Sequence, residues 1–214
     1  VTPRALTDEE IPHYVELFRQ ATINAREAGF DGVEVHGANG YLIDQFLRDG
    51  SNKRQGPYGG ELKNRTRFLF EVLDAVISAW EPGRVGLRIS PLNSYNSMKD
   101  SNPVELTKFL SSELNRFKLA YLHVMRSDFY GIQSGPVMEA ARECYRGTLI
   151  GNMGYTPKEA AEAIAKNAMQ AVAFGHHYVS NPNLVEKIKM NAPFVEPNEA
   201  TFYTPGPEGY IDYP

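Results

Sequence analysis

The sequence predicts a parallel α/β domain in which helices alternate with the strands of one sheet. Short runs rich in β-branched residues alternate with longer amphipathic stretches along the whole chain. The runs are almost continuously apolar, as strands of a parallel sheet are when both of their faces are covered. No change in composition marks an internal boundary, so residues 1–214 are expected to form a single domain. The segment 192–214, rich in Pro, Gly and Tyr, is expected to be a tail lying over the core.

Five apolar runs are predicted to be the strands. They are Gly32–His36, Val85–Ser90, Ala120–Met125, Thr148–Gly151 and Ala171–Phe174. Each has the length that is usual for a strand in a globular domain.

The stretches between the strands carry the signals that begin helices. Four starts have a capping residue followed by Glu or Pro: Thr7 with Glu10, Asn102 with Pro103, Thr156 with Glu159, and Asn181 with Pro182. Residues 68–80 show an apolar face at helical spacing. A helix followed by five strand–helix units fits either a doubly wound sheet or part of a (β/α)8 barrel, and periodicity does not choose between them.

Composition argues against several classes of function. The net charge is −4 and no basic stripe is visible, so neither a nucleic-acid partner nor a membrane-surface partner is expected. The basic residues between positions 53 and 67 are interleaved with polar residues and are interpreted as a solvated loop. No apolar run approaches the roughly 18 residues that a membrane span needs. The single cysteine, Cys144, permits no internal disulfide and fits a reducing, cytoplasmic location.

The first group of residues that could carry chemistry is the segment 36–41, His-Gly-Ala-Asn-Gly-Tyr. It follows the first predicted strand, at the carboxyl end where α/β folds place their sites. His36 and Asn39 can both donate hydrogen bonds to one oxygen atom, and Tyr41 can act as an acid because a phenol is protonated near neutral pH. The alternative interpretation is a loop that contains a structurally satisfied histidine.

A second candidate is Arg88, which interrupts the apolar strand Val85–Ser90. Burying a charge without a partner is costly. Arg88 therefore either makes a structural ion pair or faces an anionic or electron-rich ligand, and its spacing alone leaves both open.

The ends of the last two strands form the third candidate. Gly151-Asn152-Met153-Gly154 and Gly175-His176-His177 follow them. In (β/α)8 barrels, the corresponding loops commonly bind phosphate through backbone N–H groups. The chain has neither a GxGxxG nor a GxxxxGK[ST] motif. Since adjacent side chains such as His176 and His177 diverge, no metal site is expected.

Several of these motifs, in this order, resemble the old yellow enzyme family. The segment 30–47 carries the family signature around His36, and residues 51–52, 58–60, 64–65 and 85–91 also fit. Ala173-Phe174-Gly175 with 180–184 is similar to the end of that family's barrel, and the tail around Tyr203 and 209–214 is similar to the oxophytodienoate reductase and nitrate-ester reductase branch.

The resemblance implies an FMN-dependent oxidoreductase on a (β/α)8 barrel. In that family NADPH reduces the noncovalently bound FMN, and hydride passes from N5 of the flavin to the β-carbon of a small, electrophilic alkene. Enones, quinones, nitro compounds and oxylipin-type molecules suit such a pocket.

The family roles carry over to residues of this chain. His36 and Asn39 would bind the substrate oxygen, Tyr41 would protonate the α-carbon, and Arg88 would lie beside the N1/O2 edge of the flavin. The backbone of Asn152, Met153, Gly175 and His176 would cradle the phosphate, and Tyr203 would line the mouth of the substrate site. The family usually has Arg at position 176, so His176 is expected to hold FMN less tightly, because imidazole lacks the permanent charge and the bidentate geometry of a guanidinium.

The order of the motifs further implies that the chain holds barrel strands four to eight and lacks strands one to three. Such a partial barrel would expose two sheet edges and one side of its core. We therefore expect it to self-associate or to need a complementary N-terminal half. The alternative to a flavin ene-reductase is a non-catalytic half-barrel, a fragment or subunit that binds FMN only with a complementary chain. A third interpretation is another phosphate-binding α/β enzyme on a related barrel.

Overall fold

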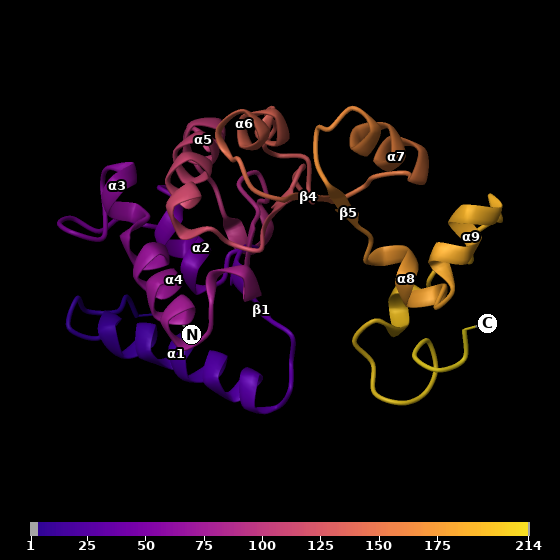
Figure 1. Cartoon of the computed structure of the whole chain (residues 1–214), viewed down its shortest axis with the longest axis horizontal. Helices are drawn as coiled ribbons and strands as arrows, with labels where there is room; N and C mark the ends of the chain where they lie inside the picture. The colour runs from indigo at the N-terminus through magenta and orange to yellow at the C-terminus, as the bar shows by residue number, and fades with distance from the viewer. Residues whose placement is uncertain (1–3, 214) are drawn as a thin grey trace.

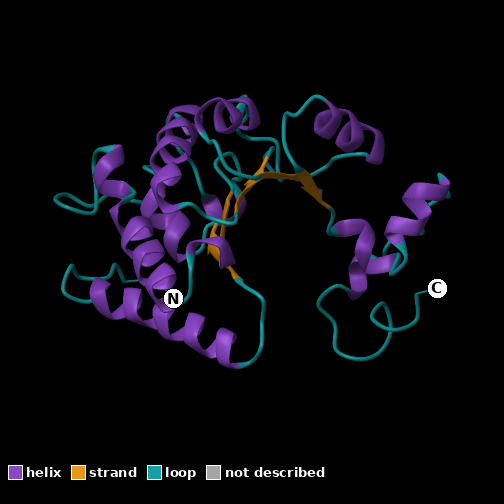
Figure 2. Cartoon of the chain, viewed as in Figure 1, coloured by secondary structure: helices purple, strands orange, loops and turns teal. Residues whose placement is uncertain are grey.

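The computed structural model describes residues 4–213, which form one curved, five-stranded parallel sheet with helices along its outer face (Figures 1 and 2). The strands are β1 Val33–Gly37, β2 Val85–Ile89, β3 Tyr121–Met125, β4 Leu149–Asn152 and β5 Ala171–Ala173. Every predicted strand is present, with boundaries that agree within one residue.

The strand order decides between the two architectures that the sequence left open. Consecutive strands are neighbours throughout, in the order β1-β2-β3-β4-β5, and all four pairings are parallel. A doubly wound sheet reverses its strand order at a switch point, whereas a (β/α)8 barrel adds its strands in sequence. The arc of strands in Figure 2 is accordingly part of a barrel, as predicted.

The helices follow the expected alternation. They are α1 Ile11–Glu27, α2 Leu42–Leu47, α3 Leu62–Arg65, α4 Arg67–Ala79, α5 Pro103–Leu114, α6 Val137–Cys144, α7 Pro157–Ala165, α8 His176–Ser180 and α9 Leu184–Met190. Short 3-10 turns occur at η1 Pro82–Arg84, η2 Tyr95–Ser97, η3 Asn115–Phe117 and η4 Glu199–Thr201. No helix within residues 4–213 has both the length and the apolar character needed to cross a membrane.

The core lies between the outer face of the sheet and these helices. Alternate strand residues are buried there, among them Val35, Leu87, Leu122, Val124 and Leu149. The apolar face predicted over 68–80 packs against them: Phe68, Leu69, Val72, Leu73 and Val76 of α4 are buried. Because side chains alternate along a strand, the intervening residues point to the inner, concave face.

The helix-start predictions were right in two cases and partly right in the others. Thr156 and Glu159 form a reciprocal capping box, and the Asn102 side chain accepts from the N–H of Glu105. Glu10 accepts from the N–H of Thr7 at 2.7 Å, but the N–H of Glu10 pairs with the Thr7 carbonyl rather than with its hydroxyl. The helix expected near Asn181-Pro182 begins later, at Leu184, after Asn183 as its N-cap.

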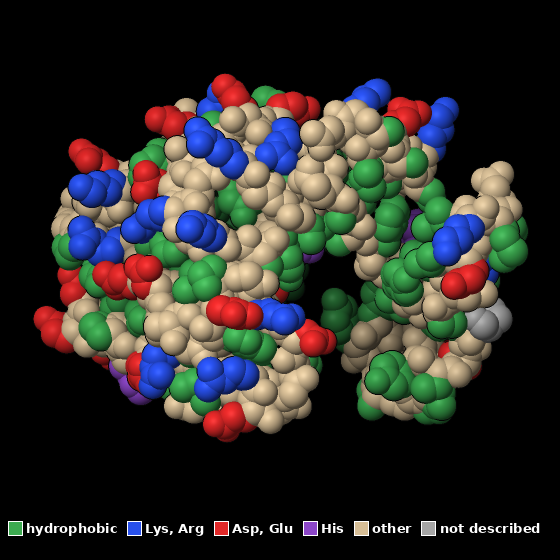
Figure 3. All heavy atoms as spheres, in the orientation of Figure 1, with side chains coloured by type: hydrophobic (Ala, Val, Ile, Leu, Met, Phe, Trp, Pro, Cys, Tyr) green, Lys and Arg blue, Asp and Glu red, His purple; other side chains and the backbone are tan. Residues whose placement is uncertain are grey.

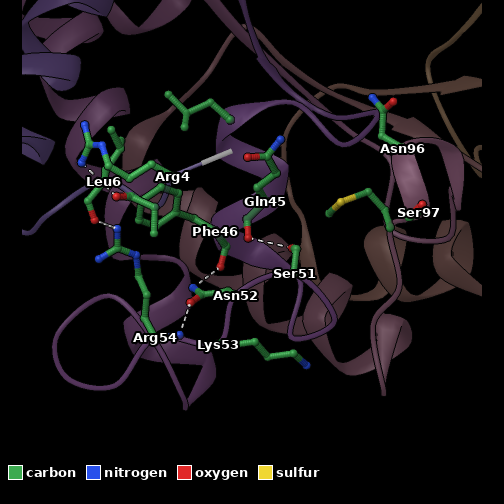
Figure 4. Close-up of a pocket in the computed structure, with 13 residues that line it drawn as sticks. Arg4, Leu6, Gln45, Phe46, Ser51, Asn52, Lys53, Arg54, Asn96 and Ser97 are labelled. Atoms are coloured by element: carbon green, nitrogen blue, oxygen red, sulfur yellow. Dashed lines mark hydrogen bonds between the residues drawn. The ribbon is translucent and has the colours of Figure 1, made fainter. Parts of the chain in front are cut away.

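The basic stretch after α2 is not wholly the solvated loop that was expected. Arg65 is buried and donates to the carbonyl of Leu47 at 2.6 Å and to Asp100 at 2.8 Å. Asn52 anchors the loop by donating to the carbonyls of Phe46 and Tyr58, at 2.7 Å each, beside a pocket of about 700 Å³ (Figure 4). These family-signature residues therefore hold the loop in place rather than forming the candidate site.

The C-terminal tail contacts α8. Ser180 donates to the carbonyl of Val195 at 2.6 Å, and the ring of Phe202 lies 5.9 Å from that of His176. These contacts join the tail to α8. The position expected for residues 192–214, over the barrel, remains a prediction. Figure 3 shows the molecule hollowed between its N-terminal elements and this tail, with hydrophobic side chains gathered around the hollow.

Candidate active site

His36 and Arg88 lie side by side on the concave face of the sheet. His36 on β1 is in register with Arg88 on β2, which is in register with His123 on β3. Partial burial, followed by the positive charge of Arg88, lowers the pKa of His36 below its ordinary value. The imidazole is therefore neutral near pH 7 and carries one N–H donor.

Asn39 is held in a left-handed turn just beyond β1, with φ of 57°. Its N–H donates to the Ser90 hydroxyl at 2.7 Å, and its carbonyl accepts from Asn96 at 3.0 Å. The Asn93 amide donates to its side-chain oxygen at 2.9 Å. Because Oδ1 of Asn39 accepts the hydrogen bond from Asn93, the Nδ2 group of Asn39 is available to donate to a ligand.

Gly40 makes this turn possible. Its φ is 74°, and a Cβ atom there would lie 2.7 Å from Cβ of Asn96 and 2.8 Å from Cγ of Met98. A residue with a side chain would therefore be strained and would also collide with the loop after β2.

Tyr41 is the N-cap of α2, and 55% of it is exposed. Its ring centroid lies 5.6 Å from that of His36, with the two planes tilted by 56°. The structure thus brings the rings of His36 and Tyr41 together at the carboxyl end of β1, and the turn at Asn39 lies between them in the chain.

Arg88 is half-buried and makes a hydrogen bond to a second predicted residue. Its Nη2 donates to Oδ1 of Asn152 at 2.9 Å, and Nδ2 of Asn152 donates to the carbonyl of Ala173 at 3.0 Å. Burial lowers the pKa of Arg88, against the attraction of Glu34. The sequence left open a structural ion pair or a ligand for Arg88. The described residues provide no ion pair for Arg88 within 4 Å, and Arg88 alternates with the buried Leu87 and Ile89, which places it on the concave face of the sheet.

The predicted phosphate loop after β4 is built around two successive left-handed residues, Met153 with φ of 81° and Gly154 with φ of 67°. Consecutive N–H groups in such turns can form an anion-binding concavity. Arg126, at the end of β3, donates to both of their carbonyls, at 2.8 and 2.6 Å, and its guanidinium lies 3.7 Å from the ring centroid of Tyr155. Arg126 therefore holds the loop after β4 in this conformation, a role that was not predicted from the sequence.

The second predicted phosphate element is the start of α8. Gly175 is its N-cap, nothing lies within 4 Å of the position a Cβ would take there, and His176 is exposed. The first N–H groups of a helix have no intrahelical acceptor. His176, His177 and Glu196 also bring potential metal-ligand atoms within 4.8 Å of one another, so the expectation of no metal remains a prediction.

Tyr203 is not brought to the other candidate residues. It is 98% exposed, and its neighbour is Phe202, at a centroid distance of 6.5 Å. Within residues 4–213 it makes no aromatic contact with His36 or Tyr41, so its place at the mouth of a substrate site remains a prediction.

The comparisons with known proteins agree with this geometry. Residues 1–194 match the model of the NADH:flavin oxidoreductase / NADH oxidase family. The chain belongs to this family. A relative named probable flavin mononucleotide-dependent alkene reductase, from Leishmania infantum, is 53% identical over 99% of the chain. The 12-oxophytodienoate reductase 2 of Arabidopsis thaliana is 42% identical over 99% of the chain.

Solved structures of old yellow enzymes share the fold closely. The old yellow enzyme from Trypanosoma cruzi superposes with a TM-score of 0.97 at 44% identity, and morphinone reductase in complex with tetrahydroNAD with a TM-score of 0.93 at 41% identity. Both comparisons cover 100% of this chain and 58% of the solved one. The chain likewise spans 58% of each of the two curated relatives. It is an old yellow enzyme family chain that corresponds to part of the barrel of its relatives.

Proposed function

We propose that this chain provides the catalytic half of an FMN-dependent reductase of activated C=C bonds. The observation that carries the proposal is the contact between the rings of His36 and Tyr41 at the end of β1, with Arg88 beside His36 on the same face and Asn39 in the turn between the two rings. Enones, quinones, nitro compounds and oxylipin-type alkenes are the substrate class, and NADPH is the proposed reductant.

The donor set suits an anionic, electron-rich cofactor. Arg88 offers a permanent charge on the concave face, while the turn at Met153-Gly154 and the open N-cap at Gly175 offer backbone N–H groups. Arg88 would face the pyrimidine edge of a flavin, and the two backbone elements, with Asn152 and His176, would hold its phosphate. When bound, FMN supplies the hydride that the β-carbon of the alkene receives.

The chain's own residues provide the remaining chemistry. The N–H of His36 and the Nδ2 group of Asn39 donate to the carbonyl or nitro oxygen of the substrate. Negative charge grows on that oxygen as the double bond is reduced, so both hydrogen bonds strengthen in the transition state and lower the barrier. The hydroxyl of Tyr41 gives its proton to the α-carbon, which completes the addition of two hydrogens across the bond.

A second candidate, a half-barrel that binds FMN only with a complementary chain, is favoured by two observations. Strands β1 and β5 each have one neighbour within the described chain, and large apolar side chains such as Tyr210 (83% exposed) and Ile211 (73%) are uncovered. Exposed strand edges and apolar patches of this kind promote association.

The visible spectrum of the purified 214-residue chain tests both candidates. Flavin absorption that bleaches with NADPH and returns on addition of an enone supports the active reductase. A colourless, oligomeric preparation that gains flavin when a family N-terminal half is added supports the second candidate. A monomer that takes up no flavin under either condition would contradict both.

A further inference from the structure

A carboxylate, an imidazole and a phenol form a partly buried cluster on the concave face, next to the proposed catalytic residues. Oε2 of Glu34 on β1 lies 3.0 Å from Nδ1 of His123 on β3. Their side chains are 30% and 12% exposed. The pair spans β2, which lies between the strands that carry it.

Gly86 allows this contact to cross β2. It is level with Glu34 on one side and with Tyr121 on the other. A Cβ on Gly86 would lie 2.3 Å from the Tyr121 ring, so the ring occupies the space that a side chain of β2 would fill. Burial, and then the nearby charge of Glu34, raise the pKa of Tyr121 to about 12, so the phenol stays protonated close to the carboxylate.

The level of the sheet above Glu34, Gly86 and Tyr121 holds three basic side chains in a row, His36, Arg88 and His123. The attraction of Glu34 supports the charged forms of both Arg88 and His36 against burial. Among the titratable side chains of these two levels, Glu34 is the one carboxylate. The charge of Glu34 (−1) is equal and opposite to that of Arg88 (+1).

The second nitrogen of His123 indicates which form this imidazole takes. Its Nε2 is buried and has no hydrogen-bond partner within the described chain, while Nδ1 is held by Glu34. A protonated ring would place a buried, unpaired N–H donor and a second positive charge beside Arg88, and both are costly. The neutral tautomer with hydrogen on Nδ1 avoids both.

We propose that Glu34 and His123 are positioning residues for the reductase. Glu34 is the counter-charge that balances Arg88, and His123 holds that carboxylate in place beneath the Arg88–His36 pair. The consequence of this arrangement for catalysis rests on the proposed function, because an anionic reduced flavin would lie against the charge of Arg88. The arrangement itself is independent of flavin binding and can be tested without it.

The first test is an NMR titration of the five histidines in the 214-residue chain. Glu34→Gln keeps an oxygen that can accept from Nδ1 of His123 but removes the charge. We expect the ratio of imidazolium to imidazole at His36 to fall about tenfold at a given pH, which corresponds to one pKa unit. Glu186→Gln, at an exposed site on α9, removes the same charge remote from the cluster and is expected to leave His36 unchanged.

The second test is the midpoint potential of the flavin-loaded protein. Without the negative charge of Glu34, the anionic reduced flavin should be favoured about tenfold, a shift of roughly +30 mV for two electrons. His123→Gln, whose amide can still donate to Glu34, should behave like the wild type, whereas His123→Leu should move both readouts. If Glu34→Gln does not fold, this second pair carries the test.

Two results would overturn the inference. Glu34→Gln could give the same His36 titration and potential as Glu186→Gln, or His123→Leu could be indistinguishable from His123→Gln. Failure to take up flavin would count against the proposed function, and the titration would still decide whether Glu34 and His123 control the charge around His36.

Discussion

Replacing Asp128 by Asn should destabilise the fold, because its carboxylate joins the loop after β2 to the loop after β3. Its side chain accepts five hydrogen bonds, all of 2.7–3.2 Å, from the Ser94 N–H and hydroxyl and from the N–H groups of Tyr130, Ile132 and Gln133. The residue is only 8% exposed. These loops also carry Asn93, which orients the Asn39 amide.

The magnitude follows from the contacts. Asn at position 128 keeps one acceptor oxygen but presents an NH2 group to the N–H groups of Ile132 and Gln133. Two charge-assisted hydrogen bonds, each contributing about 1.5–3 kcal/mol, are lost. A separate figure comes from the pKa of Asp128: burial opposes the change, but the Ser94, Gln133 and Tyr130 hydrogen bonds lower it from 3.8 to about 2. That shift corresponds to about 2.5 kcal/mol.

The sign of the pH dependence is fixed by that lowered pKa. As pH falls, the unfolded chain takes up the proton before the folded chain does. The stabilisation is therefore fully present above about pH 5 and is lost as pH falls from about 4 towards 2. Asp128→Asn should lack this component of acid sensitivity.

Urea unfolding of the wild type and Asp128→Asn at pH 7 and at pH 3 measures both effects. We expect a loss of about 2.5–6 kcal/mol at pH 7, the range that these two figures span, with a melting temperature lower by roughly 5–25 °C, and a smaller difference at pH 3. Asp31→Asn, at an exposed site, is the matched control. A loss below about 1 kcal/mol at pH 7, or an equal difference at both pH values, would refute the reasoning.

Three further predictions concern the turn and the proposed phosphate site. Gly40→Ala should lower the free energy of unfolding by about 2 kcal/mol or more. Gly56 also has a positive φ, but a Cβ there would meet nothing within 4 Å, so Gly56→Ala should lower the free energy of unfolding by only about 1 kcal/mol. Equal losses in urea unfolding would contradict the role of the collision at Gly40. Arg126→Met should release the loop after β4 and weaken FMN binding about tenfold or more, by fluorescence titration, and an unchanged dissociation constant would show that the clamp is irrelevant to the cofactor. His176→Arg should tighten FMN binding in the same assay, because a guanidinium can hold phosphate bidentately; equal dissociation constants would count against the prediction.

Local signals in the sequence predicted most of the secondary structure. A capping box acts over three residues, and strand and helix periods are visible within about ten, so Thr156 with Glu159 and the apolar face of α4 could be recognised without a fold. The segment 36–41 was recognisable as a candidate site for the same reason: its three functional side chains lie within six residues of one another. The helices α2, α3 and α8 were missed, since they have only six, four and five residues and lack a side-chain cap.

Only the tertiary structure decided how distant residues meet. Arg88 bonds to Asn152 across 64 positions, Asn93 orients Asn39 across 54, and Glu34 contacts His123 across 89. Each contact depends on strand order and register, which the alternation of apolar residues along a single strand does not encode. The sequence by itself therefore determined which residues could do chemistry, and the pairing of parallel strands determined which of them face one another.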